Sequence, residues 1–452
     1  MLLTQLDTTM KKILLLSSIA VVLTACSKDE IDDRKGEADF SRIAVIGGSY
    51  MAGYQDGALF EQGQRNSIPG IFTRHSSAAE GSSIEIPYID QEGGIGLNPK
   101  PWESVFQTKS KLNYRTDCQD TESLGPVKEL YQTESFSDLD NQSLNGQFMA
   151  VPFAGTSEIL DPDFGRSMVD GNTNPYYYRI ASDPGNSTML EDIVSYDPTF
   201  FLAWLGMDDI YNYAAYGGTT GEIPSLSEFR NNLDIILSEL TKNGGKGAIA
   251  NIPDIESFPY YNLVPHNGAN LTQAQADDLN STLYADVDHI EFREGENAFV
   301  VPDAYAPDGF RQMVHGERLL LTVPLDSIRC QLYGLMVKLV DDRYCLKSDQ
   351  IDKVIDATNN YNQIIEAKAE EYGLALVDMN GYFKNLKTGI KWNGADVNLE
   401  FVTGGFFSLD GYHPNQKGYA MLTNEFVKTI NSTYNAKVPT VNCDDCDGIL
   451  FP

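Results

Sequence analysis

Two short segments near opposite ends of the chain carry side chains that could act together as a nucleophile and a base. In the first, Ser49 follows two glycines and an apolar run; in the second, Asp410 stands three residues before His413. An aspartate at this spacing can accept the imidazole Nδ1–H, which sets the tautomer and leaves Nε2 free as a base. The spacing therefore predicts a set in which Ser49 attacks, His413 takes the proton and Asp410 orients His413. The simpler alternative is an aspartate that caps a helix beside a surface histidine.

The glycines around Ser49 allow a sharp turn after the apolar run. Such a turn would present Oγ at the carboxyl edge of a sheet, where open α/β sheets bind ligands, and the next helix would offer N–H groups to an oxyanion. A glycine-rich turn can also open a nucleotide site, but neither of the two glycine-rich nucleotide motifs is present here. No cofactor is expected.

Regular elements are needed to bring the two segments together. Apolar runs predict buried strands, and apolar residues at helical spacing predict helices between them. This alternation is typical of a parallel sheet with helices on both faces. The predicted strands cover residues 42–46, 199–205, 247–252 and 374–377, and the helices cover 229–240, 351–372 and a segment that begins near Pro414.

Two regions interrupt this alternation, at about residues 61–145 and 255–345. Long segments of this kind are usually covers over a site or small subdomains. We expect one domain over residues 41–435 that contains both insertions, with a C-terminal tail at 436–452.

The first 25 residues resemble a signal peptide. Lys11 and Lys12 precede an apolar run of eleven residues, which is too short to span a bilayer. The segment ending at Cys26 resembles the lipobox of bacterial lipoproteins, so we expect cleavage after residue 25 and a lipid on Cys26; a plain signal peptide is the alternative. Residues 26–40 form an acidic linker that resembles the export signal of Bacteroidetes surface lipoproteins, or is simply a solvated run. The expected location is the outer membrane, facing the periplasm or the cell surface.

Composition excludes several classes of partner. The chain has 452 residues with 33 Lys+Arg against 64 Asp+Glu, a net charge of −31. This excess argues against nucleic-acid binding and against electrostatic docking on an anionic membrane. A hydrophobic content of 42% is too high for a disordered acidic protein. We expect a monomer held at the membrane through the lipid on Cys26.

The remaining cysteines suggest local pairing. Cys330 and Cys345 would close a short loop, Cys443 and Cys446 a very tight one, and Cys118 would be left unpaired. One pair of cysteines two residues apart, without a nearby histidine, is weak evidence for a metal site. No metal centre is expected.

Taken together, four blocks in this order resemble the SGNH/GDSL hydrolase family, a flavodoxin-like α/β fold of esterases and lipases, and, with the lipobox, its Bacteroidetes lipoproteins. The resemblance implies a three-layer sandwich around a parallel sheet. It also implies Ser49 as nucleophile, His413 and Asp410 as its partners, and an oxyanion hole at Ser49, Gly155 and Asp208. The blocks are Ile46-Gly47-Gly48-Ser49 with Gly53, Phe153-Ala154-Gly155-Thr156, Leu205-Gly206-Met207-Asp208-Asp209, and Asp410-Gly411-Tyr412-His413-Pro414.

Two residues depart from the family pattern. Gly48 replaces the aspartate before the nucleophile, and Asp208 replaces the asparagine whose amide donates to the oxyanion. An ionised carboxylate donates no hydrogen bond, and losing one oxyanion donor typically costs ~10²–10³ in rate. Asp208 could be protonated; or backbone N–H groups of Ser49 and Gly155 could suffice, with Asn212 shifted in; or the protein could be a weak or inactive hydrolase kept for binding.

We therefore expect an ester hydrolase that acts on lipid or acylated glycan through an acyl-enzyme. The alternative from another class is a surface lipoprotein that binds glycan or lipid without catalysis. A carbohydrate esterase is a third hypothesis. Aromatic residues that could stack on sugars are Trp102, Tyr176, Tyr177, Tyr178 and Trp392.

Overall fold

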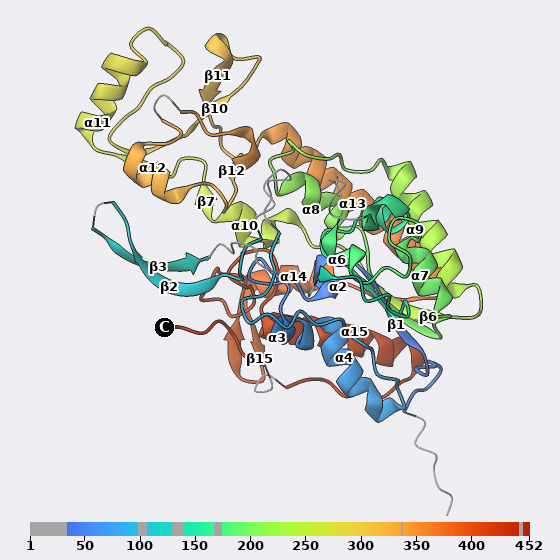
Figure 1. Cartoon of the computed structure of the whole chain (residues 1–452). Coiled ribbons are helices and arrows are strands. Elements are labelled where there is room, and N and C mark those ends of the chain that lie inside the picture. The colour runs from blue at the N-terminus through green and yellow to red at the C-terminus, as the bar shows by residue number, and fades with distance from the viewer. Residues whose placement is uncertain are drawn as a thin grey trace, which may run out of the picture.

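The computed structural model describes residues 34–97, 106–118, 120–128, 139–166, 174–335, 338–442 and 446–452. The predicted signal peptide, Cys26, Trp102 and Cys443 lie outside these residues. At the centre is a five-stranded parallel sheet with the order β14-β6-β5-β1-β4 (Figure 1). Its strands are β1 (Ile43–Gly47), β4 (Phe148–Ala150), β5 (Phe200–Trp204), β6 (Lys246–Ala250) and β14 (Ala375–Val377).

The sheet confirms the predicted flavodoxin-like α/β class. Numbered along the chain, its strands run 2-1-3-4-5, which is the flavodoxin order. Every residue of β1 and β5 is buried, as expected for parallel strands covered on both faces. β1 pairs with β4 on one side and with β5 on the other. The connections change direction between β1 and β5, so this edge is where such a sheet binds ligands.

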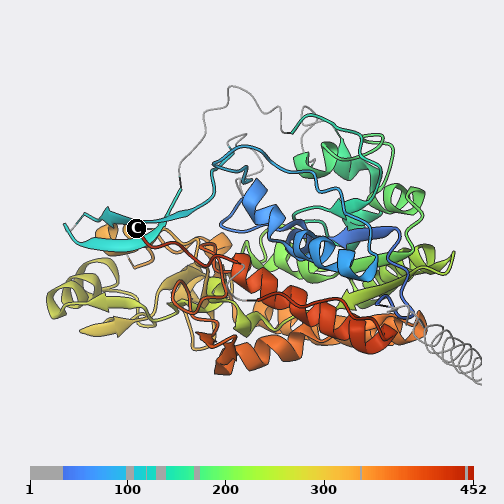
Figure 2. The ribbon, with the colours of Figure 1, turned by 90° about the horizontal axis from the view of Figure 1, so that it is seen from below.

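Helices cover both faces of the sheet and complete three layers. On one face α4 (Ile68–Ser76) packs beside α15 (Gln416–Tyr434), and Figure 2 shows these two helices side by side. The other face carries α7 (Met189–Ser195), α9 (Leu226–Thr241) and α13 (Ser348–Glu371). None of the helices described is long and apolar enough to cross a membrane.

Most predicted elements are confirmed, with small differences at their ends. The final helix begins at Gln416 because Asn415 is its cap, accepting from the Gly418 N–H at 2.9 Å, and Pro414 lies before the cap. β4 was not predicted, because three apolar residues give no recognisable period.

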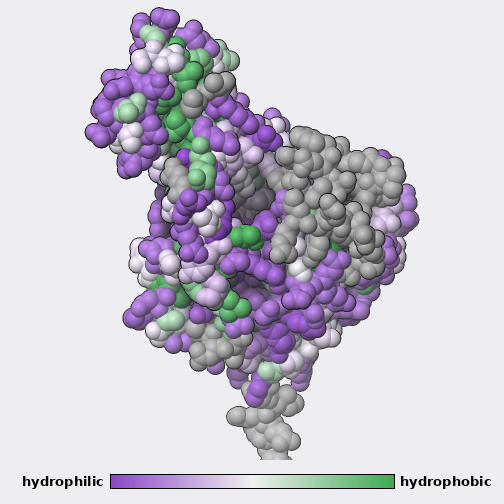
Figure 3. Space-filling view, turned by 60° about the vertical axis from the view of Figure 1, so that its left-hand side comes forward, coloured by the Kyte–Doolittle hydropathy of each residue, from purple (hydrophilic) through white to green (hydrophobic). Residues whose placement is uncertain are grey.

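The chain between β6 and α13 builds a small lobe with its own buried cluster, which runs from Ala269 to Cys345. The described part of the lobe includes three short antiparallel sheets and the α-helices α11 and α12. Its strands are β7 (Val264–Pro265), β12 (Arg318–Leu319) and β13 (Cys345–Leu346), then β8 (Ala269–Leu271) with β9 (Gly295–Asn297), and β10 (Val300–Pro302) with β11 (Phe310–Gln312); its helices are α11 (Gln273–Asp278) and α12 (Leu325–Gln331). Hydrophobic residues show along the surface of the lobe (Figure 3).

The hairpin of β2 (Lys111–Thr116) and β3 (Glu122–Val127), here called the arm, extends beside the lobe (Figures 1 and 2). A disulfide joins Cys118 of the arm to Cys330 in α12, with the Cα atoms 6.0 Å apart. The predictions that Cys118 is unpaired and that Cys330 pairs with Cys345 are therefore wrong. Cys345 is a buried thiol in the core of the lobe, whereas α12 presents Cys330 toward the arm.

Ion pairs accompany this disulfide. Arg329 contacts Asp117 at 2.5 Å, and Arg115 contacts Asp326 at 3.4 Å. Most arm residues are exposed, so little apolar burial holds the arm in place. The pair of Arg115 and Asp326 is exposed and contributes at most about 1 kcal/mol, whereas the Asp117 side chain of the other pair is 4% exposed. The disulfide is the covalent connection between the arm and the lobe.

Breaking this disulfide should release the arm. We expect Cys118→Ser to speed proteolytic cleavage within residues 111–127 and to lower the free energy of unfolding by about 2–4 kcal/mol, because a long loop is no longer closed. Limited proteolysis and denaturant unfolding measure both effects. Cys330→Ser and the double variant should match the single one, since each breaks the same bond. Unchanged cleavage in all three would show that other contacts hold the arm.

Candidate active site

Ser49 begins the short helix α2 (Ser49–Ala52) directly after β1. The turn requires a glycine before it: Gly47 has φ +152°, and a Cβ there would lie 2.6 Å from the carbonyl oxygen of Trp204. Ser49 is fully buried. It therefore lies at the carboxyl end of β1, at the edge where the sheet order changes direction.

The predicted contact between Asp410 and His413 is confirmed. Asp410 Oδ2 lies 2.9 Å from His413 Nδ1, while Oδ1 accepts the backbone N–H groups of Tyr412 and His413 at 2.9 and 2.8 Å. Although burial acts to raise its pKa, the charge of His413 and these hydrogen bonds hold the pKa of Asp410 below its usual value. His413 is 1% exposed, so the alternative of a surface histidine is excluded.

The turn Asp56–Gly57 holds the segment that carries Asp410. The Gly57 N–H donates to Asp410 Oδ2 at 3.0 Å, and the Leu409 N–H donates to Asp56 Oδ1 at 2.8 Å. The Asp56 N–H donates in turn to the Ser408 hydroxyl at 2.9 Å. Desolvation raises the pKa of Asp56 to about 7. No sequence motif pointed to this turn, because its partners are some 350 residues away.

Aromatic rings surround His413. The ring centroids of Tyr50, Tyr54, Tyr211 and Tyr412 lie 5.0 to 5.9 Å from its own. Its Nε2 is buried and has no hydrogen-bond partner among the described residues. Because Asp410 is on Nδ1, the free Nε2 is the atom that could accept a proton.

Asp208 and Phe153 are the hydrogen-bond partners of the Ser49 hydroxyl, and Asp208 is also the partner of its backbone N–H. Its hydroxyl donates to Asp208 Oδ1 at 2.5 Å, and its backbone N–H donates to Asp208 Oδ2 at 2.9 Å. The Phe153 N–H donates to Ser49 Oγ at 3.0 Å. Asp208 lies in the first turn of α8 (Met207–Ala214), which follows β5. Its carboxylate thus takes up both hydrogens that Ser49 can offer.

The two departures from the family pattern are linked in space. A Cβ at Gly48 would overlap Asp208 Oδ2. Asp208 can therefore reach Ser49 only because residue 48 lacks a side chain.

Burial raises the pKa of Asp208 to about 6, although the hydrogen bonds from Ser49 act to lower it. Burial also raises the pKa of the neighbouring Asp209 to about 7. Asp209 accepts both the N–H and the hydroxyl of Thr156, at 2.9 and 2.7 Å. A protonated Asp208, the first of the three interpretations, is thus accessible near neutral pH.

Phe153 is a donor that the sequence did not reveal. Its φ is +69°, which is uncommon for a residue with a side chain, and its carbonyl accepts from Asn212 Nδ2 at 2.9 Å. Asn212 therefore holds the Phe153 peptide. Burial raises the pKa of Glu158, and hydrogen bonds from the backbone of Glu158 and Gly155 act to lower it. The Gly155 backbone therefore faces the Glu158 carboxyl group. The oxyanion role of Gly155 stays a prediction.

The predicted sugar-stacking aromatics do not gather at this site. Tyr176 and Tyr177 are buried, and their hydroxyls donate to the carbonyls of Ile95 and Ser187. Trp392 packs against a small buried cluster near α15. Instead, the half-buried rings of Phe153 and Tyr211 stack 6.1 Å apart beside His413. The sugar-stacking role of Tyr178 stays a prediction.

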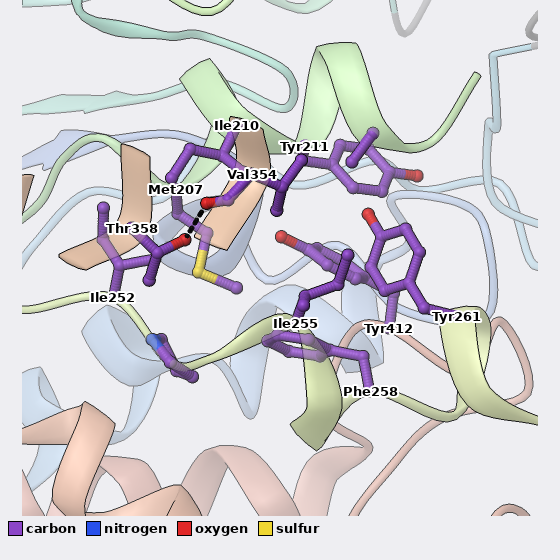
Figure 4. Close-up of a pocket in the computed structure, with 12 residues that line it drawn as sticks. Met207, Ile210, Tyr211, Ile252, Ile255, Phe258, Tyr261, Val354, Thr358 and Tyr412 are labelled. Carbon is purple, nitrogen blue, oxygen red and sulfur yellow. Dashed lines mark hydrogen bonds between the residues drawn. The ribbon is translucent and has the colours of Figure 1, made fainter. Parts of the chain in front are cut away.

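A small apolar cavity adjoins the site (Figure 4). Its volume is about 20 Å³, room for little more than a methyl group or one water. Met207 and Tyr412, the neighbours of Asp208 and His413 in sequence, line it together with Tyr211, Phe258 and Tyr261. The described residues contain no group of three or more histidine, cysteine or acidic side chains that could hold a metal.

A comparison with protein families shows the family to which the chain belongs. The family description that matches residues 43–426 is GDSL-like Lipase/Acylhydrolase. No curated protein matches the chain. The solved structures that match the chain include the following two. An alpha/beta hydrolase enzyme from the metagenome of Lake Arreo, Spain, has 9% identity and a TM-score of 0.36, covering 88% of this chain and 97% of its own. A candidate GDSL-like lipase from Parabacteroides merdae has 8% identity and a TM-score of 0.35, covering 88% and 99%.

Removing the Asp56 side chain should disturb Asp410 and His413. We expect Asp56→Ala to slow labelling of Ser49 by a fluorophosphonate about tenfold at pH 7, because the buried Leu409 N–H loses its acceptor. Asp56→Asn keeps an acceptor oxygen and should label at a rate close to that of the unmodified protein. Asp396→Asn, at a carboxylate that is 83% exposed, is the matched control. Equal rates for all variants would mean that Asp56 does not position the site.

Proposed function

Because the chain belongs to the GDSL-like lipase/acylhydrolase family, we propose that it hydrolyses carboxylic esters through an acyl-enzyme on Ser49. The observation that carries this proposal is the buried pair of Asp410 and His413, with Nε2 left without a partner. Ser49 lies just beyond the carboxyl end of β1, the strand at which the match to the family begins. These are the parts that acyl transfer by a serine requires.

In the proposed reaction, Ser49 Oγ attacks the ester carbonyl carbon while His413 Nε2 takes the hydroxyl proton. Asp410 keeps the Nδ1 proton in place and stabilises the imidazolium. When the tetrahedral intermediate collapses, His413 returns the proton to the leaving alcohol and an acyl-enzyme remains. Water, activated by His413, then releases the acid. The N–H groups of Ser49 and Phe153 are the nearest donors for the oxyanion.

Asp208 determines when this reaction can proceed. As a carboxylate it occupies the Ser49 N–H and hydroxyl, and its charge opposes an oxyanion at the same place. Once protonated, it offers one O–H donor and loses that charge. We therefore assign the active form to protonated Asp208 with neutral His413. The pKa of about 6 for Asp208 supports a measurable population of protonated Asp208.

The second candidate is a surface lipoprotein that binds glycan or lipid without catalysis. The observation that favours it is the same carboxylate, which takes both hydrogens of Ser49. A serine-directed fluorophosphonate separates the two candidates. Labelling at Ser49 supports the hydrolase, whereas an unreactive Ser49 across the pH range supports a binding protein.

The proposed anchor on Cys26 is compatible with an accessible site. The first described residue, Arg34, accepts from the Lys437 N–H at 2.7 Å, and Glu37 donates to the Tyr434 carbonyl at the end of α15. The Tyr434 hydroxyl contacts Gly247 near the start of β6. The N-terminal segment therefore joins the body at the amino ends of the strands, opposite the Ser49 edge.

Ester hydrolysis by Ser49 can be tested directly. We expect p-nitrophenyl acetate and butyrate to be cleaved, and Ser49→Ala and His413→Ala to lower the rate by at least about 10³-fold, because each removes a group that acts in the transition state. The spectrophotometric rate is measured between about pH 5 and pH 9. The enzyme proposal fails if no part of the rate depends on Ser49 at any of these pH values.

An amide at position 208 should increase activity most at high pH. Asp208→Asn supplies a donor without charge, so we expect kcat to rise about tenfold or more at pH 8, where Asp208 in the unmodified protein is ionised. At pH 5.5 much of Asp208 already carries a proton, so the gain should be smaller. Parallel kcat–pH profiles measure the ratio. A ratio near one at both pH values would mean that Asp208 does not act on the oxyanion.

A further inference from the structure

Ser49 and His413 are closed off from solvent. Ser49 is 0% exposed, His413 is 1% exposed, and the free Nε2 of His413 is buried as well. The carbonyl carbon of an ester must contact Ser49 Oγ, so a side chain that covers this centre has to move before an ester can react. Closure of this kind keeps water away from the reacting groups. Which side chain moves depends on how firmly each neighbour is held.

Two of the rings around His413 are held by hydrogen bonds. The Tyr50 hydroxyl donates to the Tyr412 carbonyl at 2.5 Å, and the Tyr54 hydroxyl donates to the Gly57 carbonyl at 2.7 Å. Tyr50, Tyr54 and Tyr412 are all at most 4% exposed. These three rings therefore belong to the fixed part of the enclosure.

Phe153 and Tyr211 are held less firmly. Both are half-buried, and their rings stack with the centroids 6.1 Å apart and the planes 16° apart. The Tyr211 hydroxyl has no hydrogen-bond partner among the described residues. This ring pair reaches from the nucleophile to the base, because the Phe153 N–H donates to Ser49 Oγ and the Tyr211 ring lies 5.9 Å from that of His413. The two rings can separate without breaking a side-chain hydrogen bond, so they are the part of the enclosure that can open.

Tyr211 also lines the cavity of about 20 Å³ beside the site (Figure 4). The lining of this cavity is apolar or aromatic apart from Thr358, whose hydroxyl already donates to the Val354 carbonyl at 2.8 Å. Tyr211 and Tyr412 each border both the cavity and the His413 ring, so they form the wall between them. With this wall in place, the cavity has room for a methyl group and not for a longer chain.

We propose that Tyr211, stacked on Phe153, is a specificity-determining residue: the ring pair closes the catalytic centre, and the Tyr211 ring limits the acyl group of the ester to a short chain such as acetyl. The selection of an acyl group rests on the proposed function, whereas the closure of the centre does not. A longer chain needs the space that the Tyr211 ring occupies. Selection of this kind rests on the size of an apolar space, which discriminates between chains that differ by a few methylene groups.

Removal of the Tyr211 ring should admit longer acyl chains. We expect Tyr211→Ala to raise the ratio of kcat/KM for p-nitrophenyl octanoate to that for the acetate about tenfold or more, because the cavity then joins the catalytic centre. Tyr211→Phe keeps the ring and should keep the ratio. Tyr114→Ala, at a tyrosine of the arm that is 55% exposed, is the matched control. A purely structural role for Tyr211 would lower both rates alike, and circular dichroism checks that each variant is folded.

Closure can be measured without hydrolysis in the full chain carrying Ser49→Ala. Diethyl pyrocarbonate modifies an imidazole only where the reagent can reach it, and peptide mass spectrometry gives the rate at each histidine. The exposed His315 serves as the internal reference. We expect Tyr211→Ala and Phe153→Ala each to speed the modification of His413 about tenfold relative to His315, and Tyr211→Phe to leave the relative rate close to that of the parent chain.

The proposal is overturned if His413 is modified at the same relative rate in all variants, or if Tyr211→Ala leaves the ratio of octanoate to acetate unchanged. The failure of the proposed function looks different. In that case the two alanine substitutions still speed the modification of His413, but no ester is cleaved in a Ser49-dependent manner. The closure by the ring pair then stands, and the selection of an acyl group falls.

Discussion

The geometry of the site depends on one interaction, the contact of the Asp208 carboxylate with Ser49. The carboxylate accepts both the backbone N–H and the hydroxyl of Ser49, at 2.9 and 2.5 Å. This contact needs the bare backbone of Gly48 to leave room for it. It also brings the first turns of α2 and α8 together, at the point where the order of the sheet changes direction. The hydrogen bonds that join α2 to α8 therefore also restrain Ser49, the proposed nucleophile.

Four carboxylates in this region each join segments that are far apart in sequence. Asp208 holds Ser49, Asp209 holds Thr156, and Asp56 holds Leu409, each through a backbone N–H. Burial raises the pKa of these three to about 6 or 7, although Lys109 and Lys128 act to lower the pKa of Asp56 and His413 acts to lower that of Asp208. Asp410 alone is paired with an imidazole, and its pKa is lowered. The site thus contains one carboxylate that stays ionised, Asp410, and three that can bind protons near neutral pH.

The two insertions surround this centre. The lobe has its own core, and the disulfide between Cys118 and Cys330 links it to the arm. Ser110 directly precedes β2 of the arm, and its N–H donates to the Asp56 carbonyl at 2.7 Å. The segment that leads into the arm is therefore in direct contact with the turn that holds the catalytic set.

Local patterns in the sequence were sufficient for the strands of the sheet except β4, for the main helices, and for the contact between Asp410 and His413, because each depends on residues close together along the chain. Only the tertiary structure decided which partners Ser49, Asp56 and Cys118 have, since these partners lie 159, 353 and 212 positions away. The partner of the Phe153 carbonyl, Asn212, likewise lies 59 residues away. The sequence could identify the reactive side chains, but the hydrogen bonds that restrain or release them arise only where folded segments meet.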